Sequence, residues 1–285
     1  MKLSTVRLDA NHTCAARHDG DELVVLPHSD VGALLASGDG WQERAAAANR
    51  ARARVADGLL APVIPHPNKI ICLGLNYATH IREMGRPAPA YPTLFAKYDG
   101  SLIGCTDDIQ MPAVSDDLDW EAELGVIIGR AGRHIRASDA LAHVAGYTVV
   151  NDITVRDWQH RTREFLSGKT FEATTPVGPA LVTTDELPAG ARGLEISCSV
   201  DGCTMQKSST SDLLFSVADI VAYVSTIITL LPGDLIATGT PGGVGAGRDP
   251  KVFLQPGQQV ITRVEGIGEL RNMVVKDELR PKERR

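Results

Sequence analysis

Two glutamates, Glu121 and Glu123, combine residue type and spacing in a way that points to chemistry. They lie in an apolar stretch, residues 118–129, which is predicted to form a β-strand because it ends in β-branched residues. Side chains alternate faces along a strand, so both carboxylates should point to one face and the apolar residues between them to the other. Neighbouring carboxylates repel each other unless a positive group lies between them. A hard divalent cation is the simplest candidate for that group.

Asp152 is the predicted third ligand of such a cation. It lies within the apolar run 147–155, where an unpaired charged side chain is unexpected. Three carboxylates with open positions for water form an all-oxygen site that suits Mg²⁺ or Mn²⁺ and could accept Ca²⁺. On spacing alone, a solvated strand face is an equal alternative for Glu121 and Glu123, and Asp152 favours the metal site. No His or Cys pattern in the sequence fits a zinc site.

His80 and Glu83 could act as a general-base pair. They are three residues apart in segment 76–85, which is predicted to be a short helix, so their side chains should share a face. A carboxylate beside a histidine raises its basicity and allows it to take a proton from water. The alternative, which spacing alone favours, is an exposed helical pair without a catalytic role. Lys169 could stabilise an enolate, although a lone lysine after a glycine is more often simply solvated.

A glycine-rich segment, residues 239–245, contains Thr240 and is the remaining motif with possible chemistry. It lacks the spacing and the lysine of a phosphate-binding loop, so that interpretation is rejected. A tight loop that offers backbone N–H groups and the Thr240 hydroxyl to a substrate carboxylate is plausible. A plain turn is an equally good interpretation of the spacing.

The chain that positions these residues is predicted to have two parts. Segment 61–68 holds three prolines and should be an extended linker between a small N-terminal α/β domain, residues 1–60, and a strand-rich catalytic domain, residues 69–285. In the first part, an Asp-Gly turn should join two short strands. The Ala- and Arg-rich residues 41–56 are predicted to form a helix. Residues 212–228 form the clearest helix, because their apolar residues recur at helical spacing.

Composition limits the possible partners. The net charge of −6 argues against a nucleic-acid-binding protein, because such proteins usually carry a basic face. The most apolar stretch, residues 213–231, contains Asp219 and has too few consecutive apolar residues to span a membrane. No apolar segment typical of a signal peptide follows Met1, and the five cysteines form no CxxC pair. A cytoplasmic protein with reduced thiols is therefore expected.

Several motifs together resemble the fumarylacetoacetate hydrolase family. They occur in the family's order, cover about residues 69–275, and are specific jointly rather than singly. The motifs are Gly74-Leu75-Asn76-Tyr77 with His80 and Glu83; Asp119-Trp120-Glu121-Ala122-Glu123-Leu124; Gly146-Tyr147 with Asn151-Asp152 and Arg156-Asp157-Trp158-Gln159; Lys169 with Pro176-Val177-Gly178-Pro179; and Pro232-Gly233-Asp234 with Thr238-Gly239-Thr240-Pro241 and Gly243-Val244-Gly245.

This resemblance implies a mixed α+β fold, rich in β-strands that roll around the active site, and a homodimer. Asn76 stands where some family members have a further acidic ligand, which leaves a site of three carboxylates. The implied residues are the metal ligands Glu121, Glu123 and Asp152, the catalytic residues His80 and Glu83 on a lid helix, and the substrate contacts Arg156, Gln159, Lys169 and Thr240.

The expected activity is metal-dependent hydrolysis of a carbon–carbon bond in a 2,4-dioxo acid, such as an acylpyruvate or fumarylpyruvate. The products would be pyruvate and a carboxylic acid. Decarboxylation of oxaloacetate or isomerisation of 2-hydroxyhepta-2,4-diene-1,7-dioate on the same metal site is the alternative. A non-catalytic carboxylate- or metal-binding protein is the alternative of another class. The pair His80 and Glu83, together with Lys169, argues against it, because a binding protein needs none of them.

Overall fold

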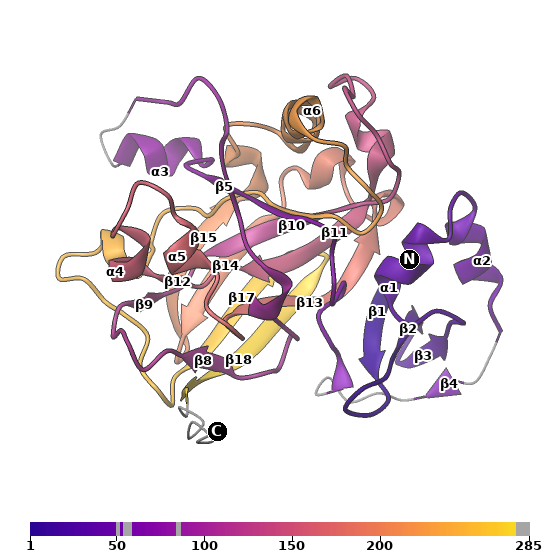
Figure 1. Ribbon diagram of the computed structural model, residues 1–285, viewed down its shortest axis with the longest axis horizontal. Coiled ribbons are helices and arrows are strands. Elements are labelled where there is room, and N and C mark those ends of the chain that lie inside the picture. The colour runs from indigo at the N-terminus through magenta and orange to yellow at the C-terminus, as the bar shows by residue number, and fades with distance from the viewer. Residues whose placement is uncertain (50–51, 54–58, 84–86, 278–285) are drawn as a thin grey trace, which may run out of the picture.

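The structure, a computed structural model, describes residues 1–49, 52–53, 59–83 and 87–277. Most of these residues belong to strands or to the loops between them, and the helices are short (Figure 1). The predicted mixed α+β, strand-rich fold is therefore confirmed. No helix among the described residues has the length and apolarity needed to cross a membrane.

The larger sheet contains eleven strands within the described residues. In sheet order they run β4-β3-β2-β1-β13-β11-β10-β16-β5-β6, and β7 pairs with β13. The bounds of these strands are β1 (Lys2–Arg7), β2 (Thr13–Asp19), β3 (Glu22–Val25), β4 (Arg52–Ala53), β5 (Ile70–Gly74), β6 (Thr93–Ala96), β7 (Leu102–Ile103), β10 (Ala122–Ile128), β11 (Val144–Asn151), β13 (Thr175–Thr183) and β16 (Leu235–Ala237).

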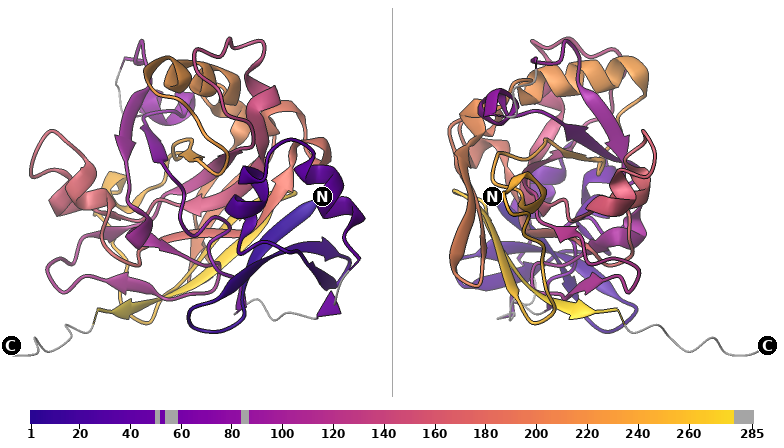
Figure 2. Two further views of the ribbon diagram at one scale, coloured as in Figure 1. Left: turned by 45° about the vertical axis from the view of Figure 1, so that its right-hand side comes forward. Right: turned by 90° about the vertical axis from the view of Figure 1, so that its left-hand side faces the viewer.

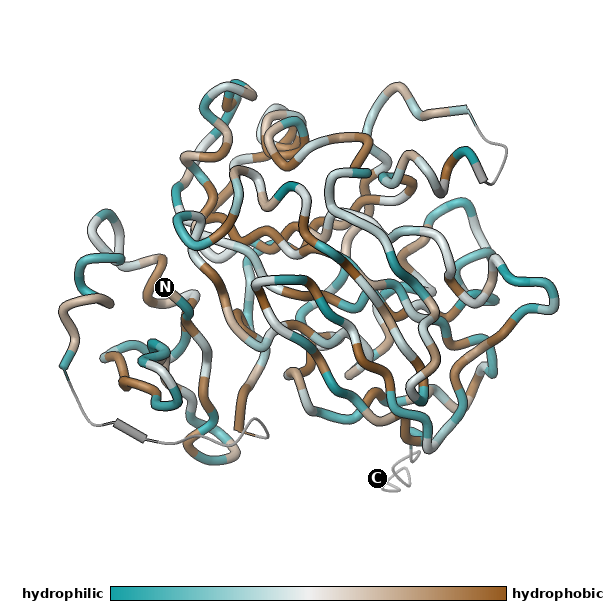
Figure 3. The backbone as a smooth tube through the Cα atoms, turned by 180° about the vertical axis from the view of Figure 1, so that it is seen from behind, coloured by the Kyte–Doolittle hydropathy of each residue, from teal (hydrophilic) through white to brown (hydrophobic). Residues whose placement is uncertain are grey.

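A smaller sheet packs against the centre of the larger one. Its five described strands run in the order β15-β14-β17-β18-β8. One core cluster joins Leu124 of β10 and Val149 of β11 to Val260 and Leu270 of the smaller sheet. Figure 3 shows hydrophobic stretches, in brown, across the larger part of the molecule. The bounds are β8 (Ile109–Met111), β14 (Glu195–Val200), β15 (Cys203–Ser209), β17 (Gln259–Val264) and β18 (Gly268–Lys276).

The N-terminal strands extend the larger sheet. β1 pairs antiparallel with β13, with Leu3 opposite Leu181, so one sheet crosses the predicted boundary at residue 60. Leu3, Val63 and Leu181 also share one hydrophobic cluster, which joins the proline-containing segment to both parts. Figures 1 and 2 show the N-terminal unit lying beside the strand-rich remainder. The division into residues 1–60, 61–68 and 69–285 stays a prediction.

Helices lie at the ends and edges of the sheets. The clearest, α6 (Val217–Ile227), begins later than the predicted residue 212, because Ser216 and Asp219 form a capping box at its start. The Ser216 N–H donates to the Asp219 carboxylate at 3.0 Å, and the Asp219 N–H donates to the Ser216 hydroxyl at 3.3 Å. The other α-helices are α1 (Val31–Ala36), α2 (Trp41–Ala47), α3 (Ala78–Glu83), α4 (Arg156–Gln159) and α5 (Leu166–Lys169).

The helix predicted over residues 41–56 is wrong beyond Ala47. The backbone of Ala48 is already extended, and Arg52–Ala53 form β4, which pairs with β3. The Arg17 guanidinium donates to the carbonyls of Ala45 and Ala46, so a side chain satisfies acceptors that a longer helix would have used. Tertiary pairing thus overrides a local preference for helix. The rest of this segment, residues 50–51 and 54–56, lies outside the described residues.

The two central strands pack too closely for a side chain at Gly125 of β10. Gly125 lies opposite Thr148 of β11. A Cβ added at this position would lie 2.7 Å from Thr148 Cγ2 and 2.8 Å from Val150 Cγ2. These distances are shorter than carbon–carbon contacts allow. Gly125 therefore permits the close approach of the strands on which Glu123 and Asp152 depend.

We expect Gly125→Ala to lower the free energy of unfolding by about 1–3 kcal/mol, because overpacking forces the central strands apart. Gly100→Ala is the matched control, since no atom lies within 4 Å of a Cβ built there. It should change stability by less than about 0.5 kcal/mol. Urea denaturation of both variants measures the difference, and equal effects would show that the spacing of β10 and β11 is not tightly constrained.

Candidate active site

The strand predicted over residues 118–129 is interrupted where its chemistry lies. β9 (Leu118–Asp119) ends before Trp120 and Glu121, and β10 resumes at Ala122. The facing chain is interrupted at Asp152 and Ile153, between β11 and β12 (Thr154–Val155). β9 pairs with β12, β10 pairs with β11, and the Asp152 N–H donates to the Glu121 carbonyl at 2.9 Å. The two interruptions therefore face each other at the centre of the fold.

The structure brings Glu121, Glu123 and Asp152 together. One carboxylate oxygen from each lies within 4.8 Å of the others, and all three residues are buried. The predicted alternation of faces also holds across the interruption, because Trp120 and Ala122 belong to the hydrophobic core. Oxygen atoms at this spacing suit a hard divalent cation. The role of the three residues as metal ligands stays a prediction.

Basic side chains compensate two of these carboxylates. Lys169 Nζ lies 2.7 Å from Glu121 Oε2 and 2.7 Å from Asp152 Oδ2, so one ammonium bridges both groups. Lys97 Nζ lies 2.6 Å from Asp152 Oδ1, and Arg156 Nη1 lies 2.6 Å from Glu121 Oε1. Lys169 is only 2% exposed, so the solvated lysine that its local sequence favoured is wrong, while its role as an enolate stabiliser stays a prediction.

This arrangement fixes the charge of Lys169 and Asp152. Burial alone would lower the pKa of Lys169, but the charges of Asp152 and Glu121 outweigh burial and raise that pKa above its usual range. Burial alone would raise the pKa of Asp152, but Lys169 and Lys97 outweigh it and hold that pKa below its usual value. Lys169 is therefore an ammonium and Asp152 a carboxylate at neutral pH.

Glu123 has an environment different from that of the other two carboxylates. Its Oε2 accepts a hydrogen bond from the Gly239 N–H at 2.8 Å, whereas its Oε1 has no hydrogen-bond partner among the described residues. Burial, and then the charges of Asp152 and Glu121, raise the pKa of Glu123 well above its usual value. An unpartnered buried oxygen beside two further carboxylates is the kind of donor set that binds a hard divalent cation. The residues present therefore fit a divalent metal.

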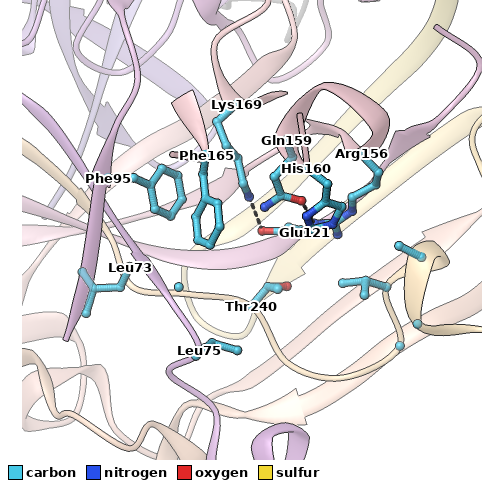
Figure 4. A pocket seen from close by; sticks show the side chains of 15 residues that line it. Leu73, Leu75, Phe95, Glu121, Arg156, Gln159, His160, Phe165, Lys169 and Thr240 are labelled. Atoms are coloured by element: carbon cyan, nitrogen blue, oxygen red, sulfur yellow. Dashed lines mark hydrogen bonds and ion pairs between the residues drawn. The ribbon is translucent and has the colours of Figure 1, made fainter. Parts of the chain in front are cut away.

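A cavity of about 400 Å³ reaches Glu121 of this cluster and the bridging Lys169, and Figure 4 shows the side chains that line it. Phe95 and Phe165 lie on one side, with ring centroids 5.8 Å apart in an edge-to-face arrangement. Arg156, Gln159 and His160 lie on the other side, near Glu121 (Figure 4). The remaining lining residues are Leu73, Gly74, Leu75, Lys169, Thr240, Gly243, Val244, Ala246 and Gly247. One part of the cavity is therefore ionic and another apolar.

The predicted substrate-contacting residues all line this cavity, but their polar atoms differ in availability. Arg156 Nη1 donates to Gln159 Oε1 at 3.0 Å, while Arg156 Nη2 has no partner among the described residues. The Thr240 hydroxyl donates to the Ala122 carbonyl at 3.0 Å and accepts from the Gln206 amide at 2.8 Å. A substrate carboxylate, which can only accept, would have to displace the bond to the Ala122 carbonyl to use the hydroxyl. Their roles toward substrate stay predictions.

His80 and Glu83 belong to α3, as predicted, but their side chains lie outside the described part of the chain. The helix itself is tethered at its start. The Thr79 N–H and hydroxyl donate to the Asp212 carboxylate at 3.0 and 2.9 Å, and Tyr77 is fully buried. Asn76, in place of an acidic ligand, uses its amide group to bind the carbonyls of Phe215 and Thr238. It is a structural residue in this fold.

Two buried charged residues near these carboxylates were not among the functional residues predicted from the sequence. Lys97 follows the strand β6, and Asp119 lies two residues before Glu121 in the same motif. Both are buried, with exposed fractions of 3% and 0%. A charged residue next to or within an apolar strand was the available signal, and it is the signal that identified Asp152. It could not identify the partners, because those come from distant segments.

Comparison with known proteins shows which family the chain resembles. Residues 69–275 match the family model described as fumarylacetoacetate (FAA) hydrolase C-terminal, which is the range expected from the motifs. Human mitochondrial oxaloacetate tautomerase FAHD2A is 45% identical over 218 residues, covering 76% of this chain and 69% of the relative. A Dictyostelium discoideum homologue of fumarylacetoacetate hydrolase domain-containing protein 2 is 42% identical over 224 residues, covering 75% and 73%.

Solved structures extend the likeness to the N-terminal part. The fumarylacetoacetate hydrolase of Exiguobacterium antarcticum superimposes with a TM-score of 0.85 at 32% identity, covering 97% of this chain and 99% of the other. Maleylpyruvate hydrolase of Sphingobium sp. SYK-6, solved with manganese(II) and pyruvate, gives a TM-score of 0.81 at 28% identity, covering 98% and 100%. One relative of the same fold thus holds a divalent cation and a 2-keto acid.

We expect Glu123→Gln to weaken Mn²⁺ binding at least about 100-fold, since it removes a charged ligand. In the metal-free protein the pKa of Glu123 is higher when folded than the unfolded value of about 4.3. The folded state then binds the proton more tightly, so wild-type stability falls as pH rises from that value toward the folded pKa. The free energy of unfolding of the variant should not contain this pH-dependent loss. The variant should therefore become more stable relative to wild type as pH rises.

Isothermal titration with Mn²⁺ and thermal unfolding between pH 4 and pH 8 measure both effects. Glu195→Gln, at an exposed strand position, is the control and should alter neither. If Glu123→Gln binds Mn²⁺ as tightly as wild type does, Glu123 is not a ligand of the metal.

Proposed function

The chain belongs to the fumarylacetoacetate hydrolase family, and we propose that it is a divalent-metal-dependent enzyme that acts on a 2-keto acid by stabilising its enolate. One observation carries this proposal. Glu121, Glu123 and Asp152 form a buried carboxylate cluster, Glu121 lines a cavity, and the ammonium group of Lys169 contacts two of the three carboxylates. A protein that only bound a carboxylate would have no need of an acidic cluster of this kind.

Each residue has a distinct role in the proposed site. A divalent cation bound by Glu121, Glu123 and Asp152 would polarise the carboxylate and keto oxygens of the substrate. Lys169 keeps its proton and stabilises negative charge that develops on the keto oxygen. Arg156, on the opposite side of the cavity from the phenylalanines, orients the substrate carboxylate.

The apolar side of the cavity supports the same chemistry. Phe95 and Phe165 limit the access of water to the ionic side, and electrostatic interactions strengthen where water is excluded. Helix α3 stands next to the cavity residue Leu75 in the chain, and closure of this segment over bound substrate would complete the enclosure.

Hydrolysis of a 2,4-dioxo acid, the reaction expected from the sequence, adds one step to enolate stabilisation. His80, supported by Glu83, would take a proton from a water molecule that attacks the distal carbonyl carbon. The carbon–carbon bond to the pyruvate part then breaks, and its electron pair forms the enolate of pyruvate. Among the relatives, the maleylpyruvate hydrolase with bound pyruvate supports this reaction.

Tautomerisation of oxaloacetate is the second candidate, and the name of the human relative at 45% identity supports it. This reaction moves a proton between carbon and oxygen through the same enolate, so it needs a base for the carbon-bound proton but no attacking water. Lys169 and the carboxylate cluster suffice for the charge stabilisation in both reactions. The two candidates therefore differ in their need for His80 to activate a water molecule.

We expect Mn²⁺-loaded wild type to turn over at least one of acylpyruvates, fumarylpyruvate, hydroxydienedioates and oxaloacetate, followed by absorbance. His80→Ala should reduce hydrolysis about 10²–10⁴-fold, the usual contribution of a general base. A tautomerase that takes the carbon-bound proton with a base other than His80 should keep most of its activity in this variant. Glu123→Ala should abolish both hydrolase and tautomerase activity. Turnover by that variant after chelator treatment would contradict the proposed metal dependence.

The homodimer and the cytoplasmic location expected from the sequence remain proposals. The names of several relatives place those proteins in mitochondria. Light scattering on the purified chain reports its oligomeric state, and imaging of the tagged protein in its own cell reports its location.

A further inference from the structure

Asp119 is the most heavily hydrogen-bonded carboxylate near the cavity, although it does not line it. It lies at the end of β9 with an exposed fraction of 0%. Its Oδ1 accepts from the N–H groups of Trp120 at 2.9 Å and Gly245 at 2.7 Å. Its Oδ2 accepts from Arg156 Nε at 2.8 Å and from the Ala246 N–H at 2.9 Å. Both oxygens are therefore filled by protein donors.

These bonds connect two walls of the cavity. Arg156 and the glycine-rich segment 243–247 both contribute lining residues, and they come from separate parts of the chain. Asp119 holds the Nε edge of Arg156, while Glu121 holds Nη1 at 2.6 Å. Because a guanidinium is planar, two fixed donors set the direction of the third. That third donor, Nη2, has no partner among the described residues.

The glycine-rich segment approaches Asp119 so closely that its sequence is constrained. A Cβ at Gly245 would lie 2.8 Å from Asp119 Oδ1 and 1.8 Å from the Val252 carbonyl oxygen. Only glycine brings the backbone N–H within 2.7 Å of the carboxylate at this position. The carboxylate therefore fixes the loop as firmly as it fixes the arginine.

We infer that Asp119 is a positioning residue that holds Arg156 and the 243–247 loop in place relative to each other. It thereby shapes the end of the cavity that receives the substrate carboxylate. This inference rests on the proposed function. Asp119 contacts neither the substrate nor the proposed metal ligand atoms, and it acts through Arg156. A buried, fully satisfied carboxylate is well suited to this task, because charge-assisted hydrogen bonds are shorter and more directional than neutral ones.

Asp119→Asn tests the inference because the amide keeps the size but offers only one acceptor oxygen. Its NH₂ group would face N–H donors that now bind a carboxylate. The probe is pyruvate, titrated by calorimetry into Mn²⁺-loaded protein. We expect pyruvate to bind Asp119→Asn at least about tenfold more weakly, which corresponds to 1.4 kcal/mol. The affinity for Mn²⁺ alone should change less than about threefold, which is below half of that energy.

Asp107→Asn is the matched control. Asp107 also binds an arginine, Arg7, and a loop N–H, that of Gly104, but none of these residues lines the cavity. It should leave pyruvate affinity unchanged while it lowers the melting temperature. Equal loss of pyruvate affinity in both aspartate variants would show that general destabilisation, not positioning, explains the effect.

A double-mutant cycle separates positioning from a purely structural role. If Asp119 acts through Arg156, adding Asp119→Asn to Arg156→Gln should weaken pyruvate binding less than it does in wild type. The same fold-loss in both backgrounds would overturn the inference. Arg156→Lys, which keeps the positive charge but loses the Nε edge that Asp119 holds, provides a second test if Asp119→Asn does not fold. Unchanged pyruvate affinity in that variant would also overturn it.

The wild-type titration distinguishes a failure of the proposed function from a failure of the proposed role of Asp119. Wild type that binds neither Mn²⁺ nor pyruvate would refute the proposed function itself. Wild type that binds both, with Asp119→Asn unchanged, would refute only the role of Asp119.

Discussion

Charge compensation among buried carboxylates is the constraint on which this structure depends. Glu121, Glu123 and Asp152 place oxygen atoms within 4.8 Å of one another in the interior. Removing such groups from water costs several kcal/mol per ion, so they persist only with counter-charges at hydrogen-bonding distance. Lys169 supplies one by bridging two of them, and Glu123 keeps an unpartnered oxygen. A cluster this costly contributes little to stability, and its cost is the physical argument that it serves a function.

Several elements of the fold position the residues of this cluster. The central strands β10 and β11 hold Glu123 and Asp152 at fixed spacing, and the facing interruptions let Glu121 and Asp152 turn toward each other. Short helices α4 and α5 deliver Arg156 and Lys169 to the ionic side of the cavity. The described residues of the N-terminal strands extend the larger sheet and supply no lining residue, whereas β6 at the opposite edge supplies Phe95.

Local signals in the sequence predicted one part of the site and not the other. Alternation along a strand paired Glu121 with Glu123, and a charge in an apolar run identified Asp152. Lys97 lies 55 residues from Asp152, so no local pattern reports their contact. The engagement of the Thr240 hydroxyl by Gln206 is equally non-local. The fold class followed from the motifs, whereas the helix over residues 41–56 failed because strand pairing outweighs intrinsic propensity.

A crystal structure of the protein saturated with Mn²⁺ tests the central claim most directly. The anomalous signal of manganese reports its position independently of any assumption about the reaction. The account predicts one strong peak per chain, within coordination distance of carboxylate oxygens from Glu121, Glu123 and Asp152, with the unpartnered Oε1 of Glu123 among the ligands. No peak at saturating Mn²⁺, or a peak elsewhere with only Lys169, Lys97 and Arg156 as counter-charges of the cluster, would contradict it.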